Sequence, residues 1–275
     1  MEMTDPRQPE ARPPKNTGNT HEESHRPRAG RSLATAVILA GSATQVSAAE
    51  PAQNDPATSP AAYVDYLRHS HEKGAAETLN AFQELKPSEQ SRFIAYLRDP
   101  ALFTAFLEQT ADRNAGVTAF SENARRSTSL RDGDVTFESE RTVSGLAASR
   151  PLRRGNHTAT HTNKLKLFGI NVVQFKLWVN FYSNGRDITR VNDADGSKRN
   201  LSGVIRISKG IPKKSLSDWQ WCPVGGSCSR GHNANASIVW EGEIGVAGVG
   251  EVQIDKRQTM KTTVHGKTTG SLKNA

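Results

Sequence analysis

Hydrophobic and polar residues alternate along residues 173–181, and this alternation is the clearest pattern in the chain. The apolar members fall at every second position: Val173, Phe175, Leu177, Val179 and Phe181. A β-strand sends successive side chains to opposite faces, so we expect these five on one buried face of a sheet. Asn184-Gly185 follows, and such a pair accepts the positive φ angles of a two-residue type I′ turn. The pattern therefore predicts a half-buried antiparallel hairpin.

The same twofold pattern recurs in shorter stretches on both sides of this hairpin. We expect further strands near residues 135–143, 158–167, 204–207, 234–240 and 258–264. Polar and glycine-rich composition predicts a loop at 192–200, an irregular stretch at 212–230 and a frayed tail after Gly266. Six to nine short strands of this kind are typical of an antiparallel β-sandwich or an open barrel.

Helical spacing replaces the twofold pattern between residues 60 and 107. Pro60 and Pro100 follow the capping residues Ser59 and Asp99, and Pro87 marks a third start, because proline suits the first helical position. Four short amphipathic helices are predicted, and so small a bundle has too little core to stand alone. We expect an α+β fold with a small N-terminal helical bundle at 50–113 and a β-rich domain at 114–275.

The first 49 residues have the three parts of a secretory signal peptide. Arg26, Arg28 and Arg31 precede an apolar run at 33–40, and small residues at 46–48 fit a cleavage site. The apolar run is far shorter than the roughly 20 residues that a membrane-spanning helix needs. We therefore expect the leader to be removed, and the mature protein to be secreted, extracellular and not anchored in the membrane.

Charge is unevenly divided between the two expected parts. Residues 50–113 contain 6 basic and 10 acidic residues, whereas residues 114–275 contain 24 basic and 13 acidic residues. A basic second part indicates contact with an anion, namely an envelope polymer, phospholipid headgroups, nucleic acid or the acidic first part itself. The lysines and arginines form no block in the sequence, so no specific nucleic-acid partner is predicted. A scattered, solvated surface is the simpler alternative.

Cys222 and Cys228 are the only two cysteines of the chain. In an oxidising compartment a close, even pair usually forms a disulfide, which here would fix one loop. Trp219 and Trp221 precede this loop and fall on the same side of an extended segment. Two such tryptophans suit binding to sugar rings or to a lipid interface, or else packing at the end of the sheets.

Three further patterns resemble functional sites. Glu241 and Glu243 project to the same side of a strand, as a glycosidase acid pair requires, although exposed acid pairs are common. Residues 192–196 resemble the start of a calcium loop but lack its later ligands, so we expect a surface turn. His157 and His161 have no third ligand nearby, and we expect loop or edge positions for both. We assign no catalytic residue and no metal ligand, and we predict no cofactor.

Three short segments resemble secreted actinobacterial proteins that have a helical N-terminal head and a β-rich body. The segments are Leu85–Pro100, Phe168–Val172 and Asp255–Thr259. The resemblance implies export and this architecture, and because the group has no assigned activity it transfers no functional residue.

These observations favour a secreted, non-enzymatic binding protein. Its basic β domain is expected to contact an anionic or glycan surface of the cell envelope. The alternative is an extracellular hydrolase acting on envelope polysaccharide, with Glu241 and Glu243 as its acids. A third possibility is that the acidic helical part masks the basic part within the same chain.

Overall fold

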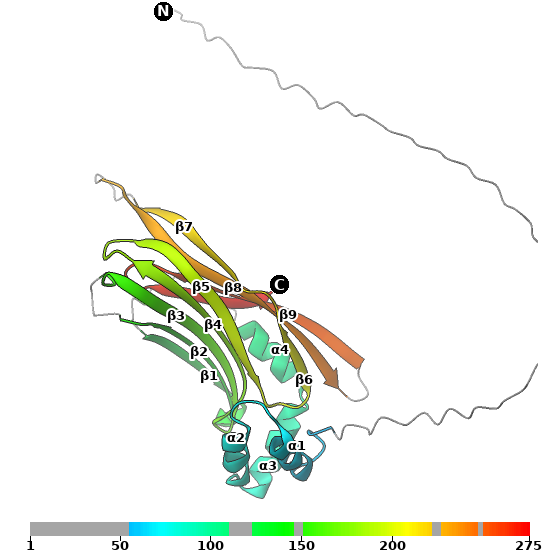
Figure 1. Ribbon diagram of the computed structural model, residues 1–275. Helices are drawn as coiled ribbons and strands as arrows, with labels where there is room; N and C mark the ends of the chain where they lie inside the picture. The colour runs from blue at the N-terminus through cyan, green and yellow to red at the C-terminus, as the bar shows by residue number, and fades with distance from the viewer. Residues whose placement is uncertain (1–54, 110–122, 146–150, 222–226, 247–249) are drawn as a thin grey trace, which may run out of the picture. The chain divides into compact units, whose positions relative to one another are not determined.

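The computed structural model describes residues 55–109, 123–145, 151–221, 227–246 and 250–275 (Figure 1). The expected signal peptide lies outside these ranges and stays a prediction. Residues 51–275 form one compact unit. Its described part contains four α-helices, a short 3-10 turn at Arg131–Gly133 and ten strands.

The four helices follow one another at the start of this unit. They are α1 (Pro60–His69), α2 (Ala75–Gln83), α3 (Pro87–Leu97) and α4 (Pro100–Gln109). Three of them begin at a proline, and the Ser59 hydroxyl accepts a hydrogen bond from the Ala62 amide at the start of α1. Asp99 likewise accepts the Ala101 amide at 3.0 Å. The helix starts therefore follow from proline and capping chemistry.

Five strands form the first sheet in simple meander order. They are β1 (Asn123–Leu130), β2 (Val135–Val143), β3 (Gly155–Leu167), β4 (Ile170–Ser183) and β5 (Ile188–Asn200). All neighbours are antiparallel, in the order β1-β2-β3-β4-β5.

The other five strands form the second sheet. They are β6 (Ile205–Lys209), β7 (Lys213–Trp221), β8 (Ser229–Val246), β9 (Gly250–Thr262) and β10 (Thr268–Asn274). The order is β10-β9-β8-β6, and β7 pairs with β8 beyond the end of β6. Within the described ranges no strand of one sheet pairs with a strand of the other. The chain therefore forms two separate antiparallel sheets rather than one closed barrel.

The two sheets share a core that is centred on β4. The predicted apolar face of this strand is buried, and the Phe175 ring lies 5.2 Å from the Trp240 ring of β8. Helix α4 enters between the sheets, where Phe106 lies 5.5 Å from Phe137 of β2 and 6.1 Å from Phe175. Figure 1 shows α4 between the two layers of strands. The helices thus share one hydrophobic core with the strands.

The two-residue turn predicted at Asn184-Gly185 is wrong. Ser183 pairs with Ile188, so the connection is four residues long, and only Gly185 in it has a positive φ. The Asn184 side chain accepts the amides of Arg186 and Asp187, each at 2.8 Å, which stabilises the wider loop. A two-residue turn with two positive φ angles occurs instead at Phe168-Gly169, between β3 and β4.

Three segments that were expected to be irregular are strands. Residues 192–200 belong to β5, residues 213–221 and 229–230 belong to the β7–β8 hairpin, and residues 268–274 form β10. In each case backbone pairing with a neighbouring strand overrides a polar local composition. Among the described helices, none is long and apolar enough to cross a membrane.

Candidate functional site

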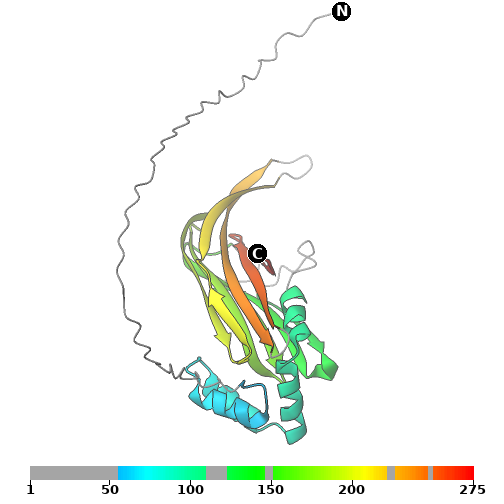
Figure 2. The ribbon, with the colours of Figure 1, turned by 90° about the vertical axis from the view of Figure 1, so that its right-hand side faces the viewer.

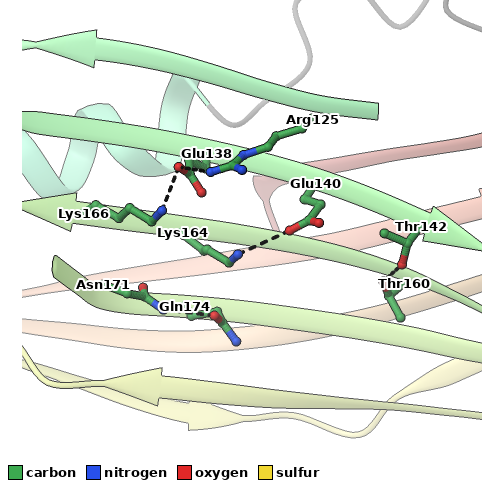
Figure 3. Close-up of polar contacts among 9 residues, drawn as sticks. All are labelled: Arg125, Glu138, Glu140, Thr142, Thr160, Lys164, Lys166, Asn171 and Gln174. Carbon is green, nitrogen blue, oxygen red and sulfur yellow. Dashed lines mark hydrogen bonds and ion pairs between the residues drawn. The ribbon is translucent and has the colours of Figure 1, made fainter. Parts of the chain in front are cut away.

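The outer face of the first sheet is rich in charge, and three of its cations are paired with carboxylates. Arg125 and Lys166 both bind one oxygen of Glu138, at 2.6 and 2.8 Å. Lys164 reaches Glu140 at 3.3 Å. Figure 3 shows these contacts crossing from β1 to β3. Two carboxylates therefore compensate part of the charge of these three cations.

Glu138 is the centre of this network, because its side chain is only 6% exposed. Burial by itself pushes the pKa of the Glu138 carboxyl upward, since it disfavours the charged form. The hydrogen bonds from Lys166 and Arg125 outweigh burial, so the pKa of Glu138 lies below its usual value. The carboxylate thus stays ionised and holds two cations.

The second sheet carries an open groove across β7, β8, β9 and β10, with a volume of about 640 Å³. Its charged lining consists of lysines, with no acid among the lining residues: Lys213, Lys214, Lys261 and Lys273. We call this feature the basic groove. The strands that form it are coloured yellow to red in Figure 2, where they curve along their length.

Three of these lysines have no ion-pair partner among the residues that the structure describes. Lys213, Lys261 and Lys273 are exposed, and no carboxylate of the described chain lies within 4.0 Å of their ammonium groups. Lys214 is different, because it donates to the Asn192 carbonyl of β5 and lies 3.8 Å from Asp193. The groove therefore presents uncompensated positive charge, in contrast to the first sheet.

A like-charged pair adds to this imbalance at one end of the groove. Arg257 of β9 lies directly opposite Lys273 of β10 in the strand register. Both side chains are exposed and neither makes an ion pair among the described residues. Like charges that face each other across a strand pair are destabilising. An anion bound between them would remove this repulsion.

Uncharged polar side chains fill the floor between the cations. They come from β7, β8, β9 and β10: Ser215, Asn235, Ser237, Thr259, Thr269 and Ser271. The Thr259 and Ser271 hydroxyls are hydrogen-bonded to each other at 2.8 Å. Their outward position follows from the alternation of β8 and β9, whose intervening residues such as Ala236 and Met260 are buried.

The two acids considered for hydrolysis lie beside this groove and outside its lining. Glu241 and Glu243 are both exposed on β8, as expected for residues two apart on a strand. Glu241 faces Asp255 of β9 in the register. This end of the face is therefore acidic, and it bounds the basic region on one side.

The β7–β8 hairpin carries the tryptophans that the sequence singled out. Trp219 is partly buried and its indole lies against Gly231, and the indole N–H has no hydrogen-bond partner among the described residues. The side chain of Trp221 and all of Cys222 lie outside the described residues, so sugar stacking and the Cys222–Cys228 disulfide stay predictions. The register pairs Trp221 with Ser229, which places the two cysteines at the start and end of the same hairpin loop.

The expected surface turn at 192–196 is wrong, because these residues lie within β5. The carboxylate of Asp195 binds Lys209 at 2.9 Å, and Asp193 lies 3.8 Å from Lys214. Lysine ammonium groups therefore occupy the place of a cation. No cluster of three or more potential metal ligands occurs in the described part of the chain.

The expected loop or edge positions of His157 and His161 are also wrong, since both are buried on β3. The His157 ring nitrogens lie 3.0 and 2.8 Å from the carbonyl oxygens of Ser144 and Arg153. Burial, helped by the nearby charge of Arg141, lowers the pKa of His161 to about 3, so this ring is neutral. Both side chains are therefore part of the buried interior of the protein.

Sequence reasoning located the basic region but missed the groove. Lys213, Lys261 and Lys273 are separated by up to 60 positions in the chain and meet only through the pairing of β7, β8, β9 and β10. The available signal was that Lys261 and Lys273 each follow an apolar residue, Met260 and Leu272, that is buried in the core.

Comparison with known proteins identifies no relative of this chain. No protein-family model, curated protein or solved structure matches the chain.

Proposed function

We propose that this chain is a secreted, non-enzymatic binding protein whose basic groove contacts an anionic polymer of the cell envelope. The observation that supports this proposal is the difference between the two sheets. Glu138 and Glu140 pair with Arg125, Lys164 and Lys166 of the first sheet, whereas no acid among the described residues pairs with the groove lysines Lys213, Lys261 and Lys273.

Uncompensated cations in a concave surface attract a polyanion by two effects. The summed positive potential raises the local concentration of anions and speeds their association. Binding of several charges to one chain also releases counterions, which makes the affinity strongly salt-dependent. No helix residue lines the groove, so within the described chain the acidic helices leave it open to a ligand. This arrangement favours an external anion over masking by residues 50–113.

The test is binding of the mature protein to immobilised anionic cell-wall polymer, with neutral dextran as the control surface. Between about 0.01 M and about 1 M salt the Debye length falls from roughly 30 Å to roughly 3 Å. We expect tight binding to the anionic polymer at low salt, a steep loss as salt rises, and no retention on dextran. Retention that is independent of salt, or absence of binding at every salt concentration, would refute the proposal.

Hydrolysis of envelope polysaccharide is the second candidate, and its support is the exposed pair Glu241 and Glu243. Side chains two apart on a strand are separated by about 7 Å, within the range that glycosidase acids use. The double substitution Glu241→Gln and Glu243→Gln distinguishes the two functions. Release of reducing sugar that disappears in this variant favours the hydrolase, and unchanged polymer binding without any sugar release favours the binding protein.

Export is part of the proposal as well. We expect protein recovered from the culture medium to begin near Glu50, after the small residues at 46–48. N-terminal sequencing of that protein tests this directly, and recovery of the uncleaved chain inside the cell contradicts it.

A further inference from the structure

We infer that the polymer bound in the basic groove is a phosphodiester-linked polyol, that is, a chain in which single negative charges alternate with hydroxyl groups. The inference rests on the proposed function and names the chemical class of its ligand. It follows from how cations and hydroxyls are interleaved in the groove.

The register of the second sheet arranges the groove in rows that run across the strands. One row contains Lys213, Ser237, Thr259 and Ser271, and the next contains Ser215, Asn235, Lys261 and Thr269. Arg257 and Lys273 form the cationic row on the other side. Each row therefore holds positive charge.

Successive rows on one face lie about 7 Å apart, because they are two residues apart along the strands. The cation of each row lies on a different strand, Lys213 on β7, Lys261 on β9 and Lys273 on β10, so the cations are spread across the groove with uncharged donors and acceptors between them. A ligand that fits this surface carries its charges singly and at intervals. It also presents hydroxyl groups to the side chains between the cations.

The hydroxyl and amide side chains can donate hydrogen bonds to the oxygens of any phosphate, but their own oxygens gain a partner only from a ligand that carries donors. Serine and threonine hydroxyls both donate and accept, as a polyol does, so the two match in either direction. Inorganic polyphosphate offers acceptor oxygens alone. The six uncharged polar side chains of the groove therefore favour a hydroxyl-bearing ligand.

The chemical class of the ligand is restricted further by the type of cation in the lining and by the lack of aromatic side chains among its described residues. Among the described residues the lining holds four lysines and no aromatic residue, so lysines outnumber the neighbouring Arg257 among the cations of the three rows. Lysine binds phosphate as a point charge, whereas the planar fork of arginine is the better match for a planar carboxylate. Single-stranded nucleic acid is usually held by stacking of its bases on aromatic side chains. Phosphodiester and polyol groups fit this lining, and carboxylated glycans and nucleic acids fit it less well.

The experiment compares three immobilised polymers: poly(glycerol phosphate), inorganic polyphosphate and polygalacturonate. The hydroxyl variant carries Thr259→Val and Ser271→Ala, which removes the hydrogen-bonded hydroxyl pair of the groove. The control variant carries Thr142→Val and Thr160→Val, which removes the equivalent pair on the first sheet, where the hydroxyls lie 2.5 Å apart. Thermal unfolding of each variant shows that it is folded before binding is measured.

We expect wild type to bind poly(glycerol phosphate) more tightly than the other two polymers. The hydroxyl variant should lose roughly tenfold in affinity for poly(glycerol phosphate), that is about 1.4 kcal/mol, because the hydrogen bonds from both hydroxyls to the ligand are lost. Its affinity for polyphosphate should fall less, because polyphosphate uses the hydroxyls as donors only, and the control variant should bind all three polymers as wild type does. Equal affinity of wild type for the three polymers, or a hydroxyl variant that binds poly(glycerol phosphate) as wild type does, overturns the inference and leaves the proposed function standing. Failure of wild type to bind any of the three overturns the proposed function itself.

Discussion

Gly196 of β5 lies directly against Trp240 of β8, and a Cβ atom at position 196 would be 2.9 Å from the indole ring. The Ile238 side chain lies equally close. This is a contact between the two sheets, and it is possible only because position 196 has no side chain. The glycine of the Asp-Ala-Asp-Gly sequence is therefore required for sheet packing and not for a turn.

The substitution Gly196→Ala is predicted to destabilise the protein by about 1–3 kcal/mol, because the added methyl group forces the sheets apart or moves Trp240 from its position. Urea unfolding followed by tryptophan fluorescence measures this change. Ser197→Ala on the exposed side of the same strand is the matched control and should change stability by less than about 0.5 kcal/mol. Equal stability of the two variants would contradict the packing described for Gly196.

Glu138→Gln is predicted to destabilise the protein by about 1–3 kcal/mol at neutral pH, because Arg125 and Lys166 lose their shared charged acceptor. The lower part of this range is expected, since the Arg125 side chain is 59% exposed and solvent screens its pair.

The pH dependence of this difference has a definite sign. The pKa of Glu138 is lower in the folded state, so its contribution is present above the unfolded pKa and is lost as pH falls through the folded pKa. Urea unfolding at pH 7 and pH 3 should show a large difference from wild type at pH 7 and a smaller one at pH 3. A difference that grows on acidification would contradict the role given to the carboxylate.

His232 links the two sheets near the β7–β8 hairpin, since its ring lies 2.6 Å from Asp187 and 3.3 Å from Asp218. The hydrogen bond to Asp187 is the main reason that the pKa of His232 is raised. Its contribution to stability is therefore complete below the unfolded pKa of about 6.5 and is lost as pH rises through the folded pKa. Melting temperatures of wild type and His232→Gln should differ most near pH 5.5 and converge near pH 9, and a constant difference would refute this ion pair.

Cys222 and Cys228 are expected to form a disulfide in the exported protein, because the β7–β8 register brings the ends of their loop together. Mass spectrometry after alkylation without reductant should show that neither cysteine has been alkylated. After reduction, both cysteines should react with the alkylating reagent. Because the closed loop is short, Cys222→Ser with Cys228→Ser should reduce stability only modestly, by about 2 kcal/mol. Two thiols that react without reductant would show that the bridge is absent.

The central strand could be read from the sequence because its pattern is local and strong. From Val173 to Phe181 apolar and polar residues alternate with Trp178 as the one exception, and the structure buries the expected face. Strands β5 and β10 could not be read in this way. Their polar residues are held by backbone pairing with β4 and β9, and pairing between distant segments leaves little trace in local composition.

Turn geometry shows the same limit. Asn184-Gly185 has the composition of a two-residue turn, but its side-chain hydrogen bonds to Arg186 and Asp187 favour a longer one. Phe168 adopts a positive φ of 49° although bulky residues rarely do so, and its ring is held between Arg92 at 5.2 Å and Tyr96 at 6.1 Å. This turn is fixed by contacts with α3, which the sequence around Phe168 does not reveal.

Prediction of the basic groove requires both the composition of the chain and the pairing of its strands. The excess of positive charge after residue 114 was evident from composition, and it predicted an anionic partner. Which cations act together depends on the pairing of four strands, so the lysines could be grouped only once the sheet order was known.

The most direct measurement compares two triple variants that have the same net charge. One carries Lys213→Gln, Lys261→Gln and Lys273→Gln in the basic groove, and the other carries Lys73→Gln, Lys86→Gln and Arg186→Gln, at exposed positions outside the groove lining. Binding to immobilised anionic cell-wall polymer is measured at low salt. We predict that the groove variant loses at least roughly tenfold in affinity and the salt dependence of binding becomes shallower, since each lost contact removes about one released counterion. The other variant should bind nearly as wild type does, and an equal loss in both variants would contradict a defined anion-binding groove.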